Sequence, residues 1–260
     1  MATIPDSATK GDPNDKLVII GLQSIGSTIS SGSPYVSKVE TFCRLNEIPY
    51  EAERPRGMKG SPKDTLPYIK HGEVVLADSE FILDYLTNTY DVKVKPSEDR
   101  KLRGTAVAVK RLCEDHLYYG LLYYRWATPG GFQLVQDNYF KGLPIPLRWF
   151  IPGQLRKKVL ETLHKQGTGR HSFADIGKLV DSSLSAVSDI LGENKFIIGD
   201  SPCPEDASLF ATLDNCLHPE VEGVPAPEMI KKYPNLVAYV ENMKNLYYPD
   251  DNPSKFANLA

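Results

Sequence analysis

Apolar and polar positions in the first part of the chain predict a strand, a loop and a helix. Residues 17–22 form a short apolar run rich in β-branched side chains, followed by turn residues, which is typical of a buried strand. The next segment, 23–32, is rich in Ser and Gly and has no periodicity, so we expect a loop. Ser33 and Pro34 suit the first positions of a helix, and apolar residues then recur at helical spacing as far as Leu45.

Three short strands and a second helix are predicted next. Residues 48–53 are typical of a short strand, whereas 54–65, rich in Pro, Gly and Lys, predict a loop or a broken helix. Residues 66–76 predict a hairpin with a tight turn at His71-Gly72. Asp78-Ser79 then opens a helix whose expected buried face is Phe81, Ile82, Tyr85 and Leu86. This order of elements predicts a small α/β domain.

From Glu98 onward the apolar spacing is helical, which predicts a second, all-α domain. A long helix ends at Pro129-Gly130-Gly131 and carries an apolar stripe of Leu102, Ala106, Val109, Cys113, Leu117 and Leu121. Further helices are expected over 154–165, 173–191, 204–217 and 235–246. The predicted organisation is a disordered tail (1–15), the α/β domain (16–91), a linker (92–98), the helical domain (99–250) and a second tail (251–260).

Composition and net charge argue against several classes of function. The 260 residues include 30 basic and 33 acidic side chains, a net charge of −3, whereas a protein whose main task is to bind nucleic acid needs a basic surplus. The four Cys form no CxxC pair and no Cys/His cluster with zinc spacing. We therefore expect reduced thiols, no bound metal, no nucleic acid partner and a cytoplasmic protein. No apolar run is long enough to span a bilayer.

Several motifs, taken in order, resemble those of the glutathione S-transferase (GST) family. In the first domain they are Ser33-Pro34-Tyr35, Leu66-Pro67-Tyr68-Ile69 and Ala77-Asp78-Ser79. In the helical domain, Gly199-Asp200 and residues 204–210 resemble the family's capping segment for a central helix. More narrowly, three stretches resemble the branch that contains failed axon connections and the metaxins: 114–126, 167–172 and 233–250. The resemblance implies an N-terminal thioredoxin-like domain followed by a C-terminal GST-type helical domain.

The resemblance also implies that glutathione is the co-substrate and that certain residues bind it. Pro67 is similar to the family's cis-proline, and the main chain of Leu66 would pair with the peptide part of glutathione. Asp78 and Ser79 are similar to the γ-glutamyl site, where a helix N-terminus and a hydroxyl suit a carboxylate and an acid suits an ammonium. An ordinary helix cap is the alternative for this pair.

Ser33 is the candidate catalytic residue. A helix N-terminus favours an anion, and a hydroxyl aimed at the glutathione sulfur would stabilise the thiolate. A plain N-cap is the alternative, and other nearby hydroxyls are candidates for the same role: Ser27, Ser30, Ser31 and Tyr35. Members of the family that use a nucleophilic Cys would carry it where this chain has Ser33, so thiol-reductase chemistry is disfavoured.

Two aromatic segments lie in the helical domain. The resemblance implies that Tyr119, Tyr123 and Trp126 line a pocket for a small hydrophobic electrophile, with interdomain packing as the alternative. The segment 147–158 mixes Trp, Phe, Arg and Lys, which suits peripheral contact with a membrane surface. We expect Pro152-Gly153 to break any helix there.

These residues and the resemblance together predict a serine-type glutathione transferase. It would conjugate a small hydrophobic electrophile, or isomerise it with glutathione, as a cytoplasmic homodimer. The alternative is a non-catalytic interaction protein of the metaxin type, which would associate with partners or with the mitochondrial outer-membrane surface. Pro67 and Asp78-Ser79 favour the enzyme, whereas the long Ser/Gly loop and the 147–158 segment favour the alternative.

Overall fold

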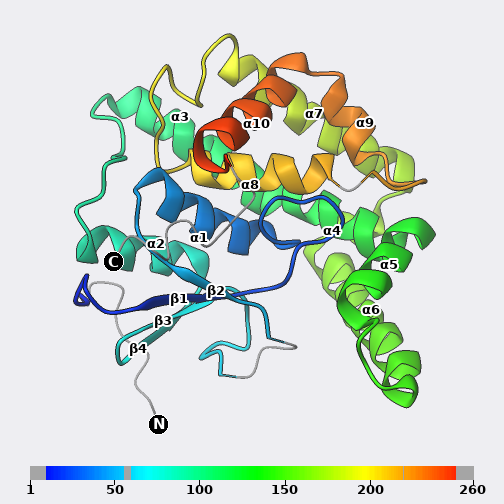
Figure 1. Ribbon diagram of the computed structural model, residues 1–260. Helices are drawn as coiled ribbons and strands as arrows, with labels where there is room; N and C mark the ends of the chain where they lie inside the picture. Colours follow the sequence, from blue (N-terminus) through cyan, green and yellow to red (C-terminus); the bar gives the residue numbers. More distant parts are fainter. Residues whose placement is uncertain (1–9, 56–59, 219, 250–260) are drawn as a thin grey trace.

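The computed structural model describes residues 10–55, 60–218 and 220–249 (Figure 1). Its first part contains a four-stranded sheet in the order β2-β1-β3-β4. The strands are β1 (Leu17–Ile20), β2 (Glu51–Glu53), β3 (Tyr68–His71) and β4 (Val74–Ala77). β1 pairs in parallel with β2 and antiparallel with β3, and β3 pairs antiparallel with β4. A parallel pair needs a crossover connection, and helix α1 (Pro34–Leu45) supplies it between β1 and β2.

Helices α1 and α2 (Ser79–Thr89) lie side by side on one face of this sheet (Figure 1). Ile19 and Ile69 of the sheet are fully buried in the same core as Phe42 of α1 and Ile82 of α2. The expected buried face of α2 is confirmed for three of its four residues. It is wrong for Phe81, which is 43% exposed and lies beneath the Lys63 ammonium, 4.5 Å from the ring centroid.

The described part of the chain after residue 98 is helical, as the sequence predicts, apart from one isolated β-bridge between Phe196 and Gly199. Its helices are α3 (Arg100–Arg111), α4 (Tyr118–Ala127), α5 (Pro129–Val135), α6 (Ile145–Gln166), α7 (Phe173–Leu191), α8 (Asp206–Leu217), α9 (Ala226–Lys231) and α10 (Pro234–Tyr247). Two π-helical segments, η1 (Leu112–Leu117) and η2 (Gln136–Phe140), and a 3₁₀ turn, η3 (Thr168–Arg170), complete the set. The predicted long helix is therefore α3, η1 and α4 in succession.

Helix α8 is the centre of the helical domain, and every one of its residues is buried. It packs directly against α1, so the core is continuous across the two domains (Figure 1). Asp206 fixes its start, because its carboxylate accepts the Cys203 N–H at 2.8 Å, the Ile197 N–H at 3.0 Å and the Tyr239 hydroxyl at 2.9 Å. Burial raises the pKa of this carboxyl, while those hydrogen bonds act in the opposite direction.

Two details of the predicted helices need correction. Pro152-Gly153 does not end a helix, because α6 continues through Pro152 as one helix of 22 residues. The short helices α5 and α9 were not expected. Within the predicted tail, residues 12–15 are exposed, the Gly11 N–H donates to the Thr89 hydroxyl at 3.1 Å, and the Asp15 carbonyl lies 3.1 Å from His71 Nε2. Residues 1–9 and 251–260 of the two predicted tails lie outside the described residues.

Candidate functional site

The loop between β1 and α1 leads into Ser33 and is held by the helical domain. The buried guanidinium of Arg125, in α4, donates to the Gly32 carbonyl and to two oxygens of Asn215, at 2.9 and 3.0 Å. The Asn215 side chain, in α8, donates in turn to the Ser31 carbonyl at 3.1 Å. The carbonyls of the two residues before Ser33 are therefore fixed by residues of the other domain.

More of this loop is attached to the same region. The Ile29 N–H donates to Asp214 Oδ2 at 3.0 Å, and Ser27 Oγ lies 3.2 Å from His218 Nδ1. Gly32 has no room for a side chain, since a Cβ there would stand 1.9 Å from the Tyr139 hydroxyl. The long Ser/Gly loop is thus packed against the helical domain and gives α1 a fixed start.

Ser33 occupies the N-cap position of α1 by its backbone, but its hydroxyl makes no capping hydrogen bond. The other candidate hydroxyls are each engaged. Ser31 Oγ donates to the Leu22 carbonyl and accepts the Ser33 N–H, Ser30 donates to Glu40, Ser27 contacts His218, and Tyr35 donates to the Glu114 carbonyl. Among these five hydroxyls, Ser33 is the one without a partner in the described part of the chain.

The first turn of α1 leaves a free donor beside this hydroxyl. Pro34 has no N–H, and the N–H groups of Val36 and Ser37 both bond to the Ser33 carbonyl. The Tyr35 N–H has no acceptor among the described residues. A free hydroxyl, a free N–H and the positive end of the helix dipole are the groups that favour an anion.

The Leu66–Pro67 peptide bond is cis, and Pro67 leads directly into β3. Asp78 lies next to it in space, because its N–H donates to the Pro67 carbonyl at 3.4 Å. Asp78 has φ 87°, a left-handed conformation that is rare for a residue other than Gly and often marks a functional site. Its Oδ2 atom lies 4.0 Å from Lys63 Nζ, and Ser79 begins α2 with little exposure, 7%.

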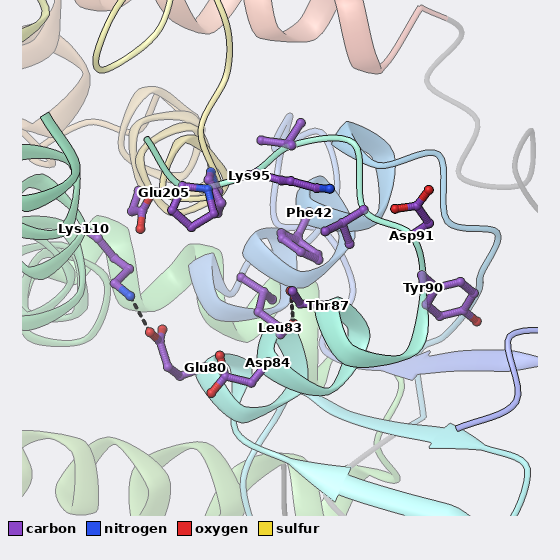
Figure 2. Close-up of a pocket in the computed structure, with 14 residues that line it drawn as sticks. Phe42, Glu80, Leu83, Asp84, Thr87, Tyr90, Asp91, Lys95, Lys110 and Glu205 are labelled. Carbon is purple, nitrogen blue, oxygen red and sulfur yellow. Dashed lines mark hydrogen bonds and ion pairs between the residues drawn. The ribbon is translucent and has the colours of Figure 1, made fainter. Parts of the chain in front are cut away.

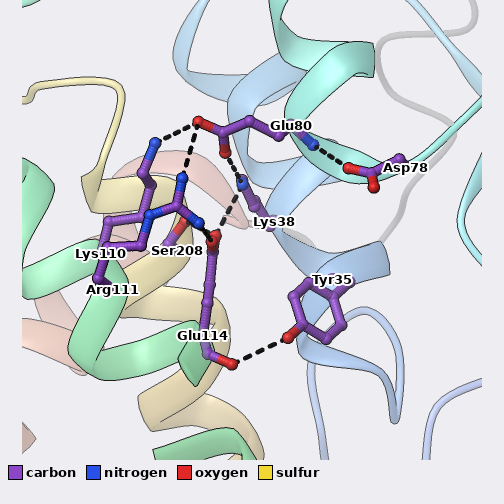
Figure 3. Close-up of polar contacts among 8 residues, drawn as sticks. All are labelled: Tyr35, Lys38, Asp78, Glu80, Lys110, Arg111, Glu114 and Ser208. Carbon is purple, nitrogen blue, oxygen red and sulfur yellow. Dashed lines mark hydrogen bonds and ion pairs between the residues drawn. The ribbon is translucent and has the colours of Figure 1, made fainter. Parts of the chain in front are cut away.

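A buried ion-pair network that the sequence did not predict lies beneath these helix starts (Figure 3). Lys38 of α1 is 1% exposed, and its Nζ atom lies 2.7 Å from both Glu80 of α2 and Glu114 of η1. Lys110 pairs with the same Glu80, and Arg111 lies 3.4 Å from Glu114. Although burial alone would raise the pKa of Glu80, Lys38 and Lys110 lower it to about 2.

The network also ties the two domains to each other. Ser208, in α8, donates to Glu114 at 2.9 Å, and the Tyr35 hydroxyl donates to the Glu114 carbonyl at 3.0 Å (Figure 3). The Tyr35 ring meets that of Tyr118 edge to face, with 4.8 Å between their centroids. A π-helical turn such as η1 is frequent at functional sites, and here it presents both oxygen groups of Glu114 toward α1.

The three residues predicted to line an electrophile pocket lie in different surroundings. Tyr119 is half-buried and contacts Tyr118, with 5.3 Å between the ring centroids, so it lies one ring away from Tyr35. Tyr123 packs against the main core. Trp126 packs with the loop residue Ile25 in a separate apolar cluster. The structure therefore brings only Tyr119 toward the start of α1.

A groove of about 440 Å³ opens on the other side of Glu80, between α2, the linker and the start of α8 (Figure 2). Its walls carry Asp84 and Leu83 of α2, Lys95 of the linker and Glu205. None of the residues predicted to bind glutathione lines it. In the described residues, no group of three or more His, Cys, Asp or Glu side chains is arranged to hold a metal, and no helix is long and apolar enough to cross a membrane.

Comparisons with known proteins agree with this architecture. Sequence profiles of the glutathione S-transferase N-terminal and C-terminal domains match residues 34–131 and 180–243. Among solved structures, a Bombyx mori glutathione transferase superposes with a TM-score of 0.56 at 14% identity, over 96% of this chain and 100% of that one. The beta-etherase LigF from Sphingobium sp. strain SYK-6 gives 0.59 at 12% identity, over 90% and 100%. This chain belongs to the glutathione S-transferase superfamily.

Its relatives include the branch that the sequence motifs suggested. Failed axon connections of Drosophila melanogaster is 29% identical over 85% of this chain and 56% of its own length. Human metaxin-1 is 26% identical over 82% of this chain and 47% of its own length. The chain thus spans about half the length of these two relatives. The isoprene-epoxide glutathione S-transferase of Rhodococcus sp. (strain AD45) is 28% identical over 83% of this chain and 92% of its own length.

Proposed function

We propose that this protein binds glutathione between the starts of α1 and α2 and uses Ser33 to stabilise its thiolate. The observation that carries the proposal is the Ser33 hydroxyl, which is free where four neighbouring hydroxyls are engaged. Leu66 and Pro67 would pair with the peptide backbone of glutathione, and Asp78 and Ser79 would hold its γ-glutamyl end. The rare backbone conformation of Asp78 supports a role beyond that of an ordinary cap.

The reaction we propose is conjugation of a small hydrophobic electrophile, or its glutathione-dependent isomerisation. The thiol proton would leave to solvent, and the Ser33 hydroxyl and the Tyr35 N–H would donate to the thiolate. In a conjugation, the sulfur forms a bond to the electrophilic carbon while the bond from that carbon to its leaving atom breaks, and a leaving oxygen takes a proton from water. Tyr119 would border the electrophile. The isoprene-epoxide relative supports this class of substrate, and a cytoplasmic homodimer is part of the proposal.

The test is a titration of the thiol of bound glutathione. Thiolate absorbance measured against pH should give a lower pKa for the bound thiol than for free glutathione. Ser33→Ala should raise that pKa and lower turnover by the equivalent of about 1.5–3 kcal/mol, the usual value of a hydrogen bond to a charged group. Ser27→Ala, in the same loop, is the matched control and should leave both unchanged. If the thiol of bound glutathione has the same pKa in Ser33→Ala as in the unaltered protein, Ser33 serves only as the N-cap of α1.

A second candidate is a non-catalytic interaction protein, in the cytoplasm or at the mitochondrial outer-membrane surface. The observation that favours it is the β1–α1 loop, which is held by hydrogen bonds to residues of α4 and α8. The effect of glutathione on thermal stability distinguishes the enzyme from the interaction protein. Ligand at about 100 times its dissociation constant should add about 2.7 kcal/mol of stability if a site exists. An unchanged melting temperature at millimolar glutathione would favour the interaction protein.

A further inference from the structure

Four large apolar side chains are exposed at the beginning of α6. Ile145 is 64% exposed, Leu147 48%, Trp149 74% and Phe150 68%. Three of these are the most exposed large apolar side chains of the described residues, and the next, Leu246 at 54%, lies alone on α10. Single exposed apolar side chains are normal on a protein surface, whereas four within six positions form a patch that calls for a partner.

The patch lies at the tip of a projection. In Figure 1, α6 extends away from the rest of the helical domain. Further along the helix, Ile151 and Leu155 pack on the apolar cluster that contains Ile25 and Val135. Residues 145–150, in contrast, are exposed without exception, so no described part of the chain covers them.

Positive charge surrounds the patch. Between residues 138 and 160 the sequence has five basic residues and no acidic one, in a chain whose net charge is −3. Four of the five are exposed and have no ion pair with a described residue: Lys141, Arg148, Lys157 and Lys158. The fifth, Arg156, is held by the carbonyls of Trp126 and Ala127 and by the face of the Phe132 ring. The exposed charges are thus available to an anionic surface.

We propose that the beginning of α6 docks onto an anionic lipid surface. Trp149 and Phe150 would enter the boundary between headgroups and acyl chains, while Arg148, Lys157 and Lys158 would face the lipid phosphates. The occupant is lipid rather than a protein groove because the apolar residues surround the helix. Residues 145 and 149 lie on one side and 147 and 150 on another, whereas a groove covers only one face. The exposed beginning of the helix would enter the headgroup layer end first, and no helix of the described residues is long and apolar enough to cross a membrane.

Vesicle flotation tests this proposal without reference to glutathione. Vesicles of phosphatidylcholine alone are compared with vesicles in which about one third is phosphatidylserine. The full chain should float with the anionic vesicles and much less with the neutral ones, and high salt should release it. The double substitution Trp149→Ala/Phe150→Ala should weaken partitioning at least about tenfold. The matched control is Leu102→Ala/Leu246→Ala, two exposed apolar residues elsewhere, which should bind as the unaltered chain does.

Tryptophan fluorescence gives a second, local measurement. The chain has two Trp, and Trp126 is half-buried against the apolar cluster that contains Ile25, so a blue shift on adding anionic vesicles should disappear in Trp149→Phe. Lys157→Glu/Lys158→Glu should abolish the preference for anionic vesicles. The proposal is overturned if the chain ignores both vesicles, or if the 149/150 substitutions leave flotation unchanged. It is also overturned if these substitutions cause an oligomer to dissociate in solution, because the patch would then be an interface with a second copy of the chain.

Discussion

Lys38 and Glu114 form a buried ion pair, with Nζ 2.7 Å from Oε1, that joins α1 of the α/β domain to η1 of the helical domain. Glu80, at the start of α2, contacts the same ammonium at the same distance. One buried lysine therefore connects both helices that begin at the proposed glutathione site with the other domain. Because its two partners would be left in a buried environment without it, this lysine is a sensitive point for stability.

Lys38→Met should destabilise the protein by about 3–5 kcal/mol, the usual cost of removing one member of a buried ion pair. The measurement is chemical denaturation followed by far-UV circular dichroism. Lys178→Met is the matched control, because its pair with Asp175 is at the surface and should contribute at most about 1 kcal/mol. The double substitution Lys38→Met/Glu114→Gln should recover part of the loss. A loss in Lys38→Met as small as that in the control would mean that the network contributes little.

The same network predicts how stability depends on pH. The pKa of Glu80 is lowered to about 2 in the folded state, from an ordinary value of 4.5. The unfolded chain therefore binds the extra proton first as pH falls, and the contribution of Glu80 is present above about pH 4.5 and lost as pH decreases toward 2. In Glu80→Gln this part of the acid-induced loss should be absent. Unfolding free energies measured across this range for both proteins provide the comparison.

Asp214 is a control, because its pKa is shifted in the opposite direction from that of Glu80. Burial raises its pKa to about 6, so the folded state holds its proton longer than the unfolded state does. Its effect lowers stability as pH rises from about 3.8 toward 6. Asp214→Asn should remove that decrease while leaving the acid side unaffected. If Glu80→Gln and Asp214→Asn changed the pH profile in the same direction, the assignment of these two groups would be wrong.

Local sequence patterns predicted the parts of the fold that depend on neighbouring residues. Ser33-Pro34 and Asp78-Ser79 mark the starts of α1 and α2 because capping and proline preferences act within one turn. The Asp206 carboxylate likewise accepts the N–H of Cys203, three positions before it, at 2.8 Å. The order of strands and helices followed from such signals, and the family resemblance supplied their arrangement.

Contacts between distant residues could not be predicted in the same way. Lys38 meets Glu80 and Glu114 across 42 and 76 positions of the chain, and nothing local in the sequence announces either pairing. Arg125 and Asn215 likewise act on the β1–α1 loop from far away in the sequence. The helix prediction failed at Pro152 for a related reason, because this proline is buried by tertiary packing that overrides its local preference.

Arg125 donates a hydrogen bond to the Gly32 carbonyl, so its substitution should increase the motion of the β1–α1 loop. Arg125→Lys keeps the charge but loses the planar group that contacts Gly32 and Asn215 together. Hydrogen exchange over residues 23–33 should become faster, and stability should decrease by about 2–3 kcal/mol because a buried bonding group is lost. Arg156→Lys, whose guanidinium bonds other carbonyls in α4, is the control and should leave the exchange of this loop unchanged. Unchanged exchange in Arg125→Lys would mean that Asn215 and Asp214 suffice to hold the loop.

Ser79 should contribute to glutathione affinity and little to folding. Ser79→Ala removes a hydroxyl at the start of α2 and should weaken glutathione binding by about 1–3 kcal/mol in calorimetry. Asp78→Asn keeps the size of the side chain and its oxygen acceptor for the Glu80 N–H while removing the charge that would pair with the ammonium. Thr87→Ala, at the other end of α2, is the control. Unchanged affinity in both Ser79→Ala and Asp78→Asn would place the ligand elsewhere.

Asp206 should contribute to stability but not to glutathione affinity. Its buried carboxylate accepts from Cys203, Ile197 and Tyr239. Asp206→Ala leaves the two N–H groups without an acceptor and the Tyr239 hydroxyl with only the Asp206 carbonyl, so it should cost about 3 kcal/mol or more of stability. Asp99→Ala is the matched control, because Asp99 caps α3 with two similar N–H bonds but is exposed, and its loss should cost about 1 kcal/mol. Thermal denaturation measures both values. Glutathione affinity per folded molecule should be the same in both variants, since neither residue touches the starts of α1 and α2. If Asp206→Ala reduced that affinity in a fully folded sample, the α8 cap would belong to the binding site as well as to the fold.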